Sequence, residues 1–124
     1  MTFSESAAEG PRVGGSAVSA SSRRVDGALV LSIGGDIDLA GAPRLRPAIE
    51  VALAQQAAIL IVDLTEVSFL SSSGIGALVD IRRRAGEGTA VRVVATPVAA
   101  RPISLTAVNQ LMPVFGTLAE AIRG

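Results

Sequence analysis

Three consecutive serines, at positions 71–73, are the residues of this chain best placed to do chemistry. They open a stretch with helical apolar spacing, Ser72–Ala85, so their hydroxyl groups would lie at the start of a helix. The unpaired N–H groups and the positive end of the helix dipole at such a start favour either a capping hydroxyl or an attached phosphate. Spacing alone leaves two interpretations: a serine that only caps the helix, or a capping serine that a kinase also uses.

A helical projection at about 100° per residue separates the three serines. Ser72 projects opposite the centre of the apolar stripe, whereas Ser71 and Ser73 project to its flanks. The stripe consists of Gly74, Ala77, Leu78, Ile81 and Ala85. The face that carries Ser72 also holds Gly76, Val79 and Arg83. We therefore expect Ser72 to point most directly at solvent, on a face that a partner protein can reach.

The chain lacks the side chains on which most enzymes depend. It has no His, Cys or Lys, so it offers no imidazole base, no thiol nucleophile, no Schiff base and no Lys-dependent phosphate loop. Gly74 and Gly76 form only G-x-G, without the third glycine of a dinucleotide fingerprint. Asp36 and Asp38 offer too few oxygen ligands for a metal ion, and we expect at least one of them to cap a loop. We expect no enzyme, no catalytic residue, no cofactor and no metal.

Length and charge point to one small binding or signalling domain. The 124 residues carry 11 acidic and 11 basic side chains, and this balance argues against direct binding to nucleic acid or to an anionic membrane. The arginines at 82–84 end the helix, where cations are favourable and usually solvated, which leaves a partner contact for Arg83 as the alternative. The sequence shows no targeting segment and no membrane-length apolar run, so we expect a cytoplasmic protein.

The elements that must position the serines indicate an α/β fold. The expected strands are Ala17–Val25, the alternating and half-buried run Leu29–Gly34, Ala58–Asp63, Thr89–Ala95 and Leu111–Phe115. The expected helices are Gly41–Gln55, Ser72–Ala85, Pro97–Val108 and a last one opened by a capping box at Thr117–Glu120. Asp26-Gly27 predicts a hairpin, which places an antiparallel first strand at the edge of a mostly parallel sheet of about five strands, with four helices. We expect a single domain over residues 16–124, after a disordered arm of residues 1–15.

The stretch from Asp63 to Leu78 resembles the signature of the STAS domain, and in particular that of the bacterial anti-sigma factor antagonists. The family pattern is Asp-Leu-(Ser/Thr)-x-Val-x-Phe-(Leu/Met)-Asp-Ser-Ser-Gly-(Leu/Ile)-Gly. This chain matches it at Asp63–Thr65, Val67, Phe69–Leu70 and Ser72–Gly76. A second motif, at residues 35–40, is similar to the family's Gly-Glu-Leu-Asp-Leu-Ala before its first helix. The departure from the pattern is Ser71, which stands where the family has Asp.

The resemblance implies a regulatory protein. Unphosphorylated members of the family bind an anti-sigma factor and so release its sigma factor, and a serine-kinase anti-sigma factor phosphorylates the serine that corresponds to Ser72. With the preceding Asp replaced, Ser71 and Ser73 are alternative phosphate acceptors, and a serine phosphatase is a further expected partner. The expected partner-binding residues are Asp38, Ser72, Ser73, Gly76, Val79 and Arg83. The alternative function is a STAS module that acts as a non-phosphorylated scaffold or as a small-ligand sensor.

Overall fold

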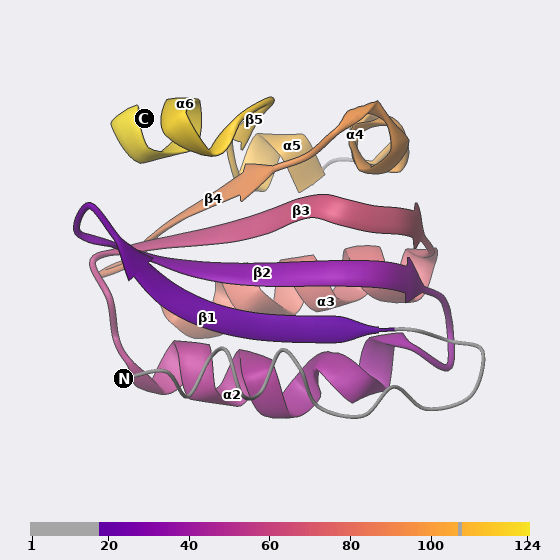
Figure 1. Ribbon diagram of the computed structural model, residues 1–124, viewed down its shortest axis with the longest axis horizontal. Coiled ribbons are helices and arrows are strands. Elements are labelled where there is room, and N and C mark those ends of the chain that lie inside the picture. Colours follow the sequence, from indigo (N-terminus) through magenta and orange to yellow (C-terminus); the bar gives the residue numbers. More distant parts are fainter. Residues whose placement is uncertain (1–17, 107) are drawn as a thin grey trace.

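The computed structural model describes residues 18–106 and 108–124, in which strands and helices alternate along the chain (Figure 1). The strands are β1 Ser19–Val25, β2 Ala28–Ile37, β3 Ile59–Leu70, β4 Ala90–Val94 and β5 Val114–Phe115. The helices are the 3₁₀ helix η1 Ala42–Leu45 and the α-helices α2 Arg46–Ala54, α3 Ser72–Ala85, α4 Pro97–Ser104, α5 Val108–Leu111 and α6 Leu118–Arg123. The expected disordered arm, residues 1–15, lies outside the described residues.

The five strands form one sheet in the order β1-β2-β3-β4-β5. β1 runs antiparallel to β2, and every other neighbouring pair is parallel. The hairpin turn places Asp26 at φ 50° and Gly27 at φ 85°, left-handed conformations that an Asp-Gly pair adopts readily. The mostly parallel five-stranded sheet with an antiparallel first strand at its edge is thus confirmed.

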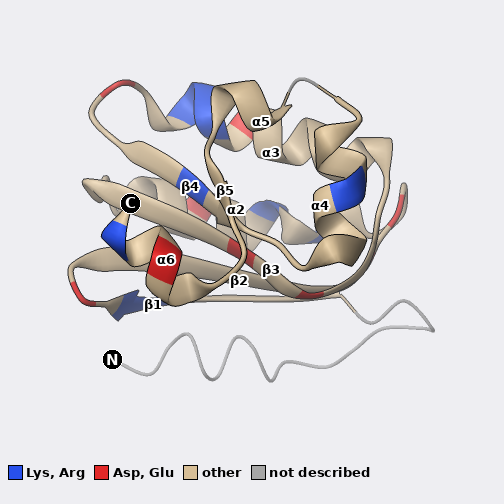
Figure 2. Cartoon of the chain, turned by 90° about the horizontal axis from the view of Figure 1, so that it is seen from above, with Lys and Arg blue, Asp and Glu red and all other residues tan. Residues whose placement is uncertain are grey.

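Helices cover both faces of the sheet, and this arrangement gives the protein two hydrophobic clusters. The larger cluster joins one face to α2, α3, α4 and α5, through residues such as Ile49, Leu78 and Ile103. The smaller cluster contains Ala28, Val30, Ile61, Val94 and Ala121. Figure 2 shows α6 on the opposite side of the strands from α3. The expectation that the strand around Leu29 is half-buried is therefore wrong in one respect: Val30 is fully buried, because α6 covers its face of the sheet.

Two strands that lead to the serines are longer than the apolar pattern indicates. The continuous apolar run ends at Asp63, but β3 continues to Leu70, and its parallel partner β2 continues to Ile37. Exposed polar residues such as Glu66 therefore belong to the strand, since backbone hydrogen bonds between β2 and β3 hold them there without burial.

Prolines account for most differences between the expected and observed helices. The expected helix Gly41–Gln55 is divided into η1 and α2, and Pro47 lies in the first turn of α2, where its missing N–H is tolerated. The expected helix Pro97–Val108 ends earlier, because α4, which contains Pro102, ends at Ser104. α5 begins only at Val108 and includes Leu111, so the expected strand Leu111–Phe115 is shortened to β5. The described part of the chain therefore has five α-helices rather than four, because α5 was not expected.

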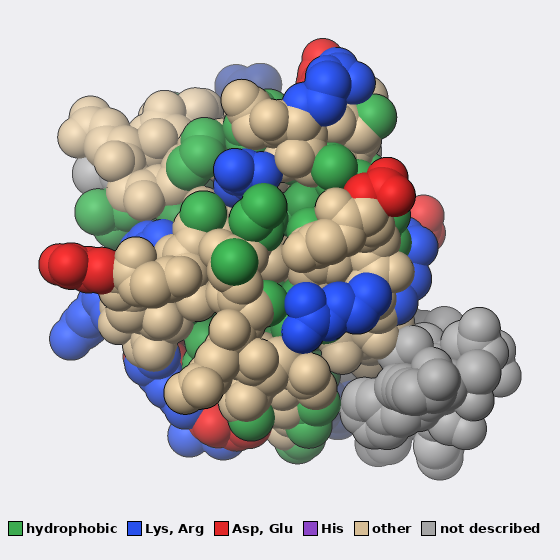
Figure 3. Space-filling model, turned by 90° about the vertical axis from the view of Figure 1, so that its left-hand side faces the viewer, with side chains coloured by type: hydrophobic (Ala, Val, Ile, Leu, Met, Phe, Trp, Pro, Cys, Tyr) green, Lys and Arg blue, Asp and Glu red, His purple; other side chains and the backbone are tan. Residues whose placement is uncertain are grey.

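Acidic and basic residues are distributed over several elements of the described chain, although three arginines follow one another at the end of α3 (Figure 2). At one end of the molecule charged side chains lie among hydrophobic and polar ones (Figure 3). Within residues 18–106 and 108–124, no helix combines the length and the apolar character that crossing a bilayer requires.

Candidate functional site

Ser71 is the residue that caps α3. Its extended backbone (φ −83°, ψ 176°) precedes the helix, and its Oγ accepts a hydrogen bond from the Gly74 N–H at 3.3 Å. The same hydroxyl donates to the Ile37 carbonyl oxygen at 2.6 Å, and the Ser71 N–H donates to that oxygen at 2.9 Å. Ser71 therefore satisfies one of the open N–H groups at the start of α3 and ties this start to the end of β2.

Ser72, the first residue of α3, has the exposed position that the projection predicts. Its hydroxyl makes no hydrogen bond with any residue that the structure describes. Ser73 is half-buried and lines a groove between α3 and the segment that leads into α2. The structure thus gives the three serines three different environments, and the capping role that spacing could not assign belongs to Ser71.

The two glycines of the G-x-G sequence differ in their surroundings. A Cβ on the buried Gly74 would lie 2.5 Å from Leu70 Cδ1 and 2.9 Å from Ile37 Cγ2, so close packing of α3 on the sheet requires glycine there. A Cβ on Gly76 would meet nothing within 4 Å, and Gly76 is exposed on the helix. Packing therefore explains Gly74, but nothing within the described chain explains Gly76.

The remaining residues of the outward face of α3 are not equally accessible. Arg83 is exposed, but Val79 is only half-buried and packs against the larger hydrophobic cluster, so its expected outward position is partly wrong. The physical reason is that α3 has neighbours on two sides, α2 and α5, which leave a narrower exposed face than a projection with one apolar stripe assumes.

The arginines at the end of α3 have separate roles. Arg82 donates hydrogen bonds to the carbonyl oxygens of Gly86 and, at 3.0 Å, Thr89, and so closes the carboxyl end of the helix. Arg84 forms an ion pair with Glu50 of α2 at 2.6 Å. Arg83 forms no ion pair within the described residues, which leaves its charge available to another molecule.

The ion pair between α2 and α3 shifts the titration of both of its members. The hydrogen bond from Arg84 holds the pKa of Glu50 below its ordinary value, and the positive charges of Arg84 and Arg46 act in the same direction. The hydrogen bond that Arg84 donates to Glu50 raises the pKa of Arg84, with a smaller contribution from Asp80, whose carboxylate lies 3.5 Å away. Both side chains remain substantially exposed, so the pair orients the two helices more than it stabilises them.

Asp38 holds the loop that follows β2. Its Oδ1 accepts a hydrogen bond from the Gly41 N–H at 2.6 Å, and its carbonyl oxygen accepts one from the Ala42 N–H at 2.9 Å. Asp38 directly follows Ile37, whose carbonyl oxygen accepts the hydrogen bonds from Ser71. This loop and the start of α3 therefore lie at the same edge of the sheet. Asp36 accepts a hydrogen bond from the Ser68 hydroxyl at 2.6 Å. The residues that the structure describes include no group of three potential metal-ligating side chains.

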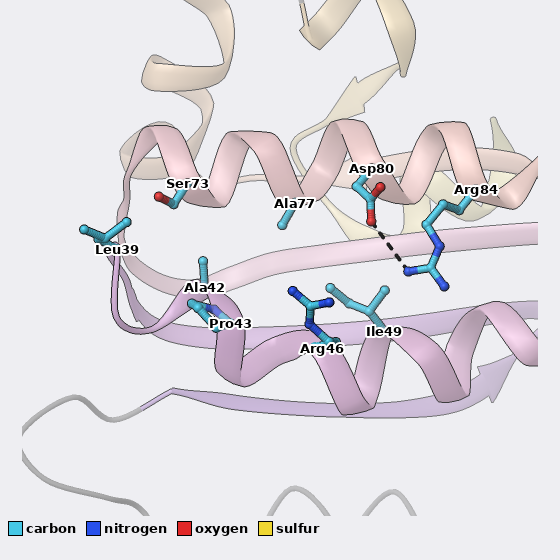
Figure 4. Close-up of a pocket in the computed structure, with 9 residues that line it drawn as sticks. All are labelled: Leu39, Ala42, Pro43, Arg46, Ile49, Ser73, Ala77, Asp80 and Arg84. Carbon is cyan, nitrogen blue, oxygen red and sulfur yellow. Dashed lines mark ion pairs between the residues drawn. The ribbon is translucent and has the colours of Figure 1, made fainter.

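Sequence reasoning missed a groove of about 270 Å³ beside the outward face of α3 (Figure 4). Its lining comprises Leu39, Ala42, Pro43, Arg46, Ile49, Ser73, Ala77, Asp80 and Arg84. The α3 residues among them follow the spacing i, i+4, i+7, i+11, and each comes directly after a residue of the outward face that carries Ser72. That spacing is visible in the sequence, but the groove exists only because α2 packs beside α3.

Comparison with known sequences supports a single family. The family model of the STAS domain matches residues 19–121. The anti-sigma-F factor antagonist RsfB of Mycobacterium tuberculosis is 38% identical over 100 residues, which cover 80% of this chain and 82% of that protein. The anti-sigma-B factor antagonist of Listeria monocytogenes is 37% identical over 59 residues, which cover 44% of this chain and 52% of that protein.

Solved structures agree with this assignment. An anti-sigma factor antagonist from Mycobacterium paratuberculosis superposes with a TM-score of 0.83 and 33% identity, over 89% of this chain and 95% of that one. The phosphorylated form of the Bacillus cell fate determinant SpoIIAA has the same fold, with a TM-score of 0.58 and 24% identity over 85% of this chain and 97% of that one. Proteins of this family regulate by binding and are not enzymes. The chain therefore belongs to the STAS domain family, and within it to the anti-sigma factor antagonists.

Proposed function

We propose that this chain binds an anti-sigma factor of the serine-kinase type through the outer face of α3 and thereby releases a sigma factor, and that phosphorylation of Ser72 ends this binding. The name of the mycobacterial relative, which matches most of both chains, supports the first part. The different environments of the three serines support the second. Since sigma factors act on transcription, the proposal places the protein in the cytoplasm.

The observation that carries the proposal is the exposed glycine at position 76. A glycine inside a helix costs about 1 kcal/mol relative to alanine, and no neighbouring atom within 4 Å offsets this cost at Gly76. A missing side chain lets another backbone approach the helix closely. Gly76 lies one turn after Ser72, so a partner that uses this flat surface also covers the Ser72 hydroxyl.

Ser72 is a better phosphate acceptor than either neighbour. A phosphate on Ser71 would remove the proton that its hydroxyl donates to Ile37 and bring negative charge next to that carbonyl oxygen. Ser73 is half-buried beside α2. A phosphate on the exposed Ser72 would instead meet the open N–H groups of α3 and leave the fold intact. Its charge of about −1.5 to −2 would then enter a surface that otherwise meets a neutral hydroxyl, where desolvation without a counter-charge costs several kcal/mol.

The replacement of the family's Asp by Ser71 is compatible with this switch. Ser and Asp cap helices about equally well, so the helix start keeps its cap and loses only a negative charge. The hydroxyl can also donate to the Ile37 carbonyl oxygen, which a carboxylate cannot do. With less negative charge beside it, Ser72 meets a kinase in a more neutral setting than in the family pattern.

The other expected contact residues have distinct parts in the proposal. Asp38 fixes the loop beside the helix start, and Arg83 offers an unpaired positive charge at the far end of the contact face. Ser73 and Val79, both half-buried, contribute the parts of their side chains that remain accessible. A serine phosphatase would restore the unphosphorylated form and so the binding.

The test uses the full chain and each purified anti-sigma factor of the source bacterium, with binding measured by calorimetry before and after incubation with ATP. We expect one of them to bind, to phosphorylate Ser72 and then to release the chain. Ser72→Gln should bind and Ser72→Glu, which has the same size, should not, because only the second adds charge.

Mass spectrometry of the treated chain separates the alternatives. Phosphate on Ser71 or Ser73 would move the switch by one residue. Binding without any phosphate would favour the scaffold function, and a small molecule bound with no protein partner would favour the ligand sensor.

A further inference from the structure

The groove between α2 and α3 combines an apolar lining with one positive charge, that of Arg46, which has no side-chain partner in the described chain. Leu39 at its mouth is 78% exposed, and Ala42, Ile49 and Ala77 line it with small or aliphatic side chains. Arg46 extends from the start of α2 toward the groove (Figure 4). Its guanidinium forms no ion pair and no hydrogen bond within the described residues, and it affects the pKa of Glu50 only through charge attraction.

Arg46 is exposed at the junction of two helices. It ends η1, where a cation is favourable, and begins α2, where a cation is unfavourable, so the helix dipoles do not account for it. Arg84, the other cation of the groove, is paired with both Glu50 and Asp80. A carboxylate bound from outside would therefore find one uncompensated positive charge, beside an apolar surface.

The open shape of the groove favours side chains of a protein over a free metabolite. Pockets for small molecules enclose most of the ligand, whereas this groove of about 270 Å³ is open along the helices. Such a groove can hold one aliphatic side chain against its apolar lining and one carboxylate beside Arg46.

We infer that the anti-sigma factor docks on two adjacent stripes of α3, the outward stripe that carries Ser72 and Gly76 and the groove stripe that carries Ser73 and Ala77. It places an aliphatic side chain next to Leu39 and Ala77 and a carboxylate on Arg46. This inference rests on the proposed function, because it names further contacts of the same partner. Ser73 belongs to the groove stripe and directly follows Ser72 on the other stripe, so the two stripes form one continuous surface. The groove then selects among anti-sigma factors by charge and side-chain size, independently of the phosphorylation switch.

The test compares two charge reversals in calorimetry with the anti-sigma factor that binds the wild-type chain. Arg46→Glu should weaken binding about a hundredfold, the loss typical of a close interfacial charge pair. It should not unfold the protein, because an acidic residue suits the first turn of α2. Arg23→Glu is the matched control. Arg23 is the register partner of Val30, so both side chains lie on the face of the sheet that α6 covers, away from the groove. Leu39→Ser should weaken binding about tenfold, and Leu39→Met should restore most of it.

A second arm identifies the carboxylate. Each exposed Asp or Glu of the anti-sigma factor is replaced by Arg, and one replacement should restore binding to Arg46→Glu. The inference is overturned if Arg46→Glu binds as tightly as Arg23→Glu, or if no replacement restores binding. If the wild-type chain itself binds no anti-sigma factor, the proposed function fails and the inference falls with it, a result that the wild-type titration alone identifies.

Discussion

Replacement of the two glycines of α3 should change stability in opposite directions. At the exposed Gly76, alanine gains about 1 kcal/mol of helix propensity and meets no atom within 4 Å. For a chain of 124 residues this gain corresponds to a rise of roughly 3–5 °C in the midpoint of thermal unfolding. Gly76→Ala should therefore be more stable than the wild type.

At Gly74 the same substitution has a steric cost. The new methyl group would lie 2.5 Å from Leu70 Cδ1 and 2.9 Å from Ile37 Cγ2. Leu70 is buried, and the methyl group of Ile37 is attached directly to its branched Cβ, so neither atom can move away without disturbing the contact between α3 and the sheet. Overpacking of this kind costs about 1–3 kcal/mol, which cancels or exceeds the helix gain. Gly74→Ala should be no more stable than the wild type, and we expect it to be less stable.

The decisive variant is Gly76→Gln, measured by chemical unfolding and by calorimetry with the anti-sigma factor. Glutamine is a better helix former than glycine and points into open space, so the free energy of unfolding should rise. Binding should fall at least about tenfold, because a long side chain separates two surfaces that need close approach. Wild-type affinity in Gly76→Gln would refute the assignment of the contact surface to this face, and a loss of stability in Gly76→Ala would refute the account of Gly76 as an exposed helical residue.

Three further predictions concern the elements around the site. Ser71→Ala should lower the free energy of unfolding by about 1–2 kcal/mol through loss of the α3 cap, and Ser71→Thr, which keeps the hydroxyl, should lose much less in the same denaturant titration. Because the folded-state pKa of Glu50 lies below its ordinary value of 4.5, the stabilising effect of its pairing with Arg84 is present above that value and is lost as the pH falls below it. The difference in thermal midpoint between the wild type and Glu50→Gln should therefore shrink between pH 6 and pH 3, and a constant difference would contradict the pairing. Arg92 donates hydrogen bonds to the carbonyl oxygens of Ala121 and Ile122 at 2.9 and 3.3 Å, and so caps the end of α6. Arg92→Met should therefore speed hydrogen exchange in α6 and leave partner binding unchanged. Equal exchange rates in Arg92→Met and in the control Arg123→Met would count against this cap.

Local sequence signals predicted the elements whose causes are local. The Asp26-Gly27 hairpin and the helix start at Thr117, whose Oγ1 accepts a hydrogen bond from the Glu120 N–H at 3.1 Å, depend on neighbouring residues and were correctly predicted. The exposed place of Ser72 follows from helical periodicity alone. Such features need no knowledge of how distant segments pack.

Open questions and errors arise where a distant segment decides the outcome. The sequence leaves open which serine caps α3, and the hydroxyl of Ser71, the observed cap, also reaches Ile37, which is 34 residues earlier in the chain. Val30 is buried by a helix at the end of the chain, and Val79 is half-buried because α3 has two neighbours. A helical projection contains no information about such neighbours, and for the same reason it could not reveal the groove beside Arg46.

The link between Ser71 and Ile37 affects how fast and at what entropic cost a partner associates. The Ile37 carbonyl oxygen accepts hydrogen bonds from both the N–H and the hydroxyl of Ser71. The end of β2, the Asp38 loop and the first turn of α3 are therefore fixed relative to one another before a partner binds. A partner then docks on a preorganised surface and loses little conformational entropy of this chain on binding. Association should be rapid and weakly temperature-dependent, and affinity should be regulated mainly by the dissociation rate, on which a single added phosphate acts directly.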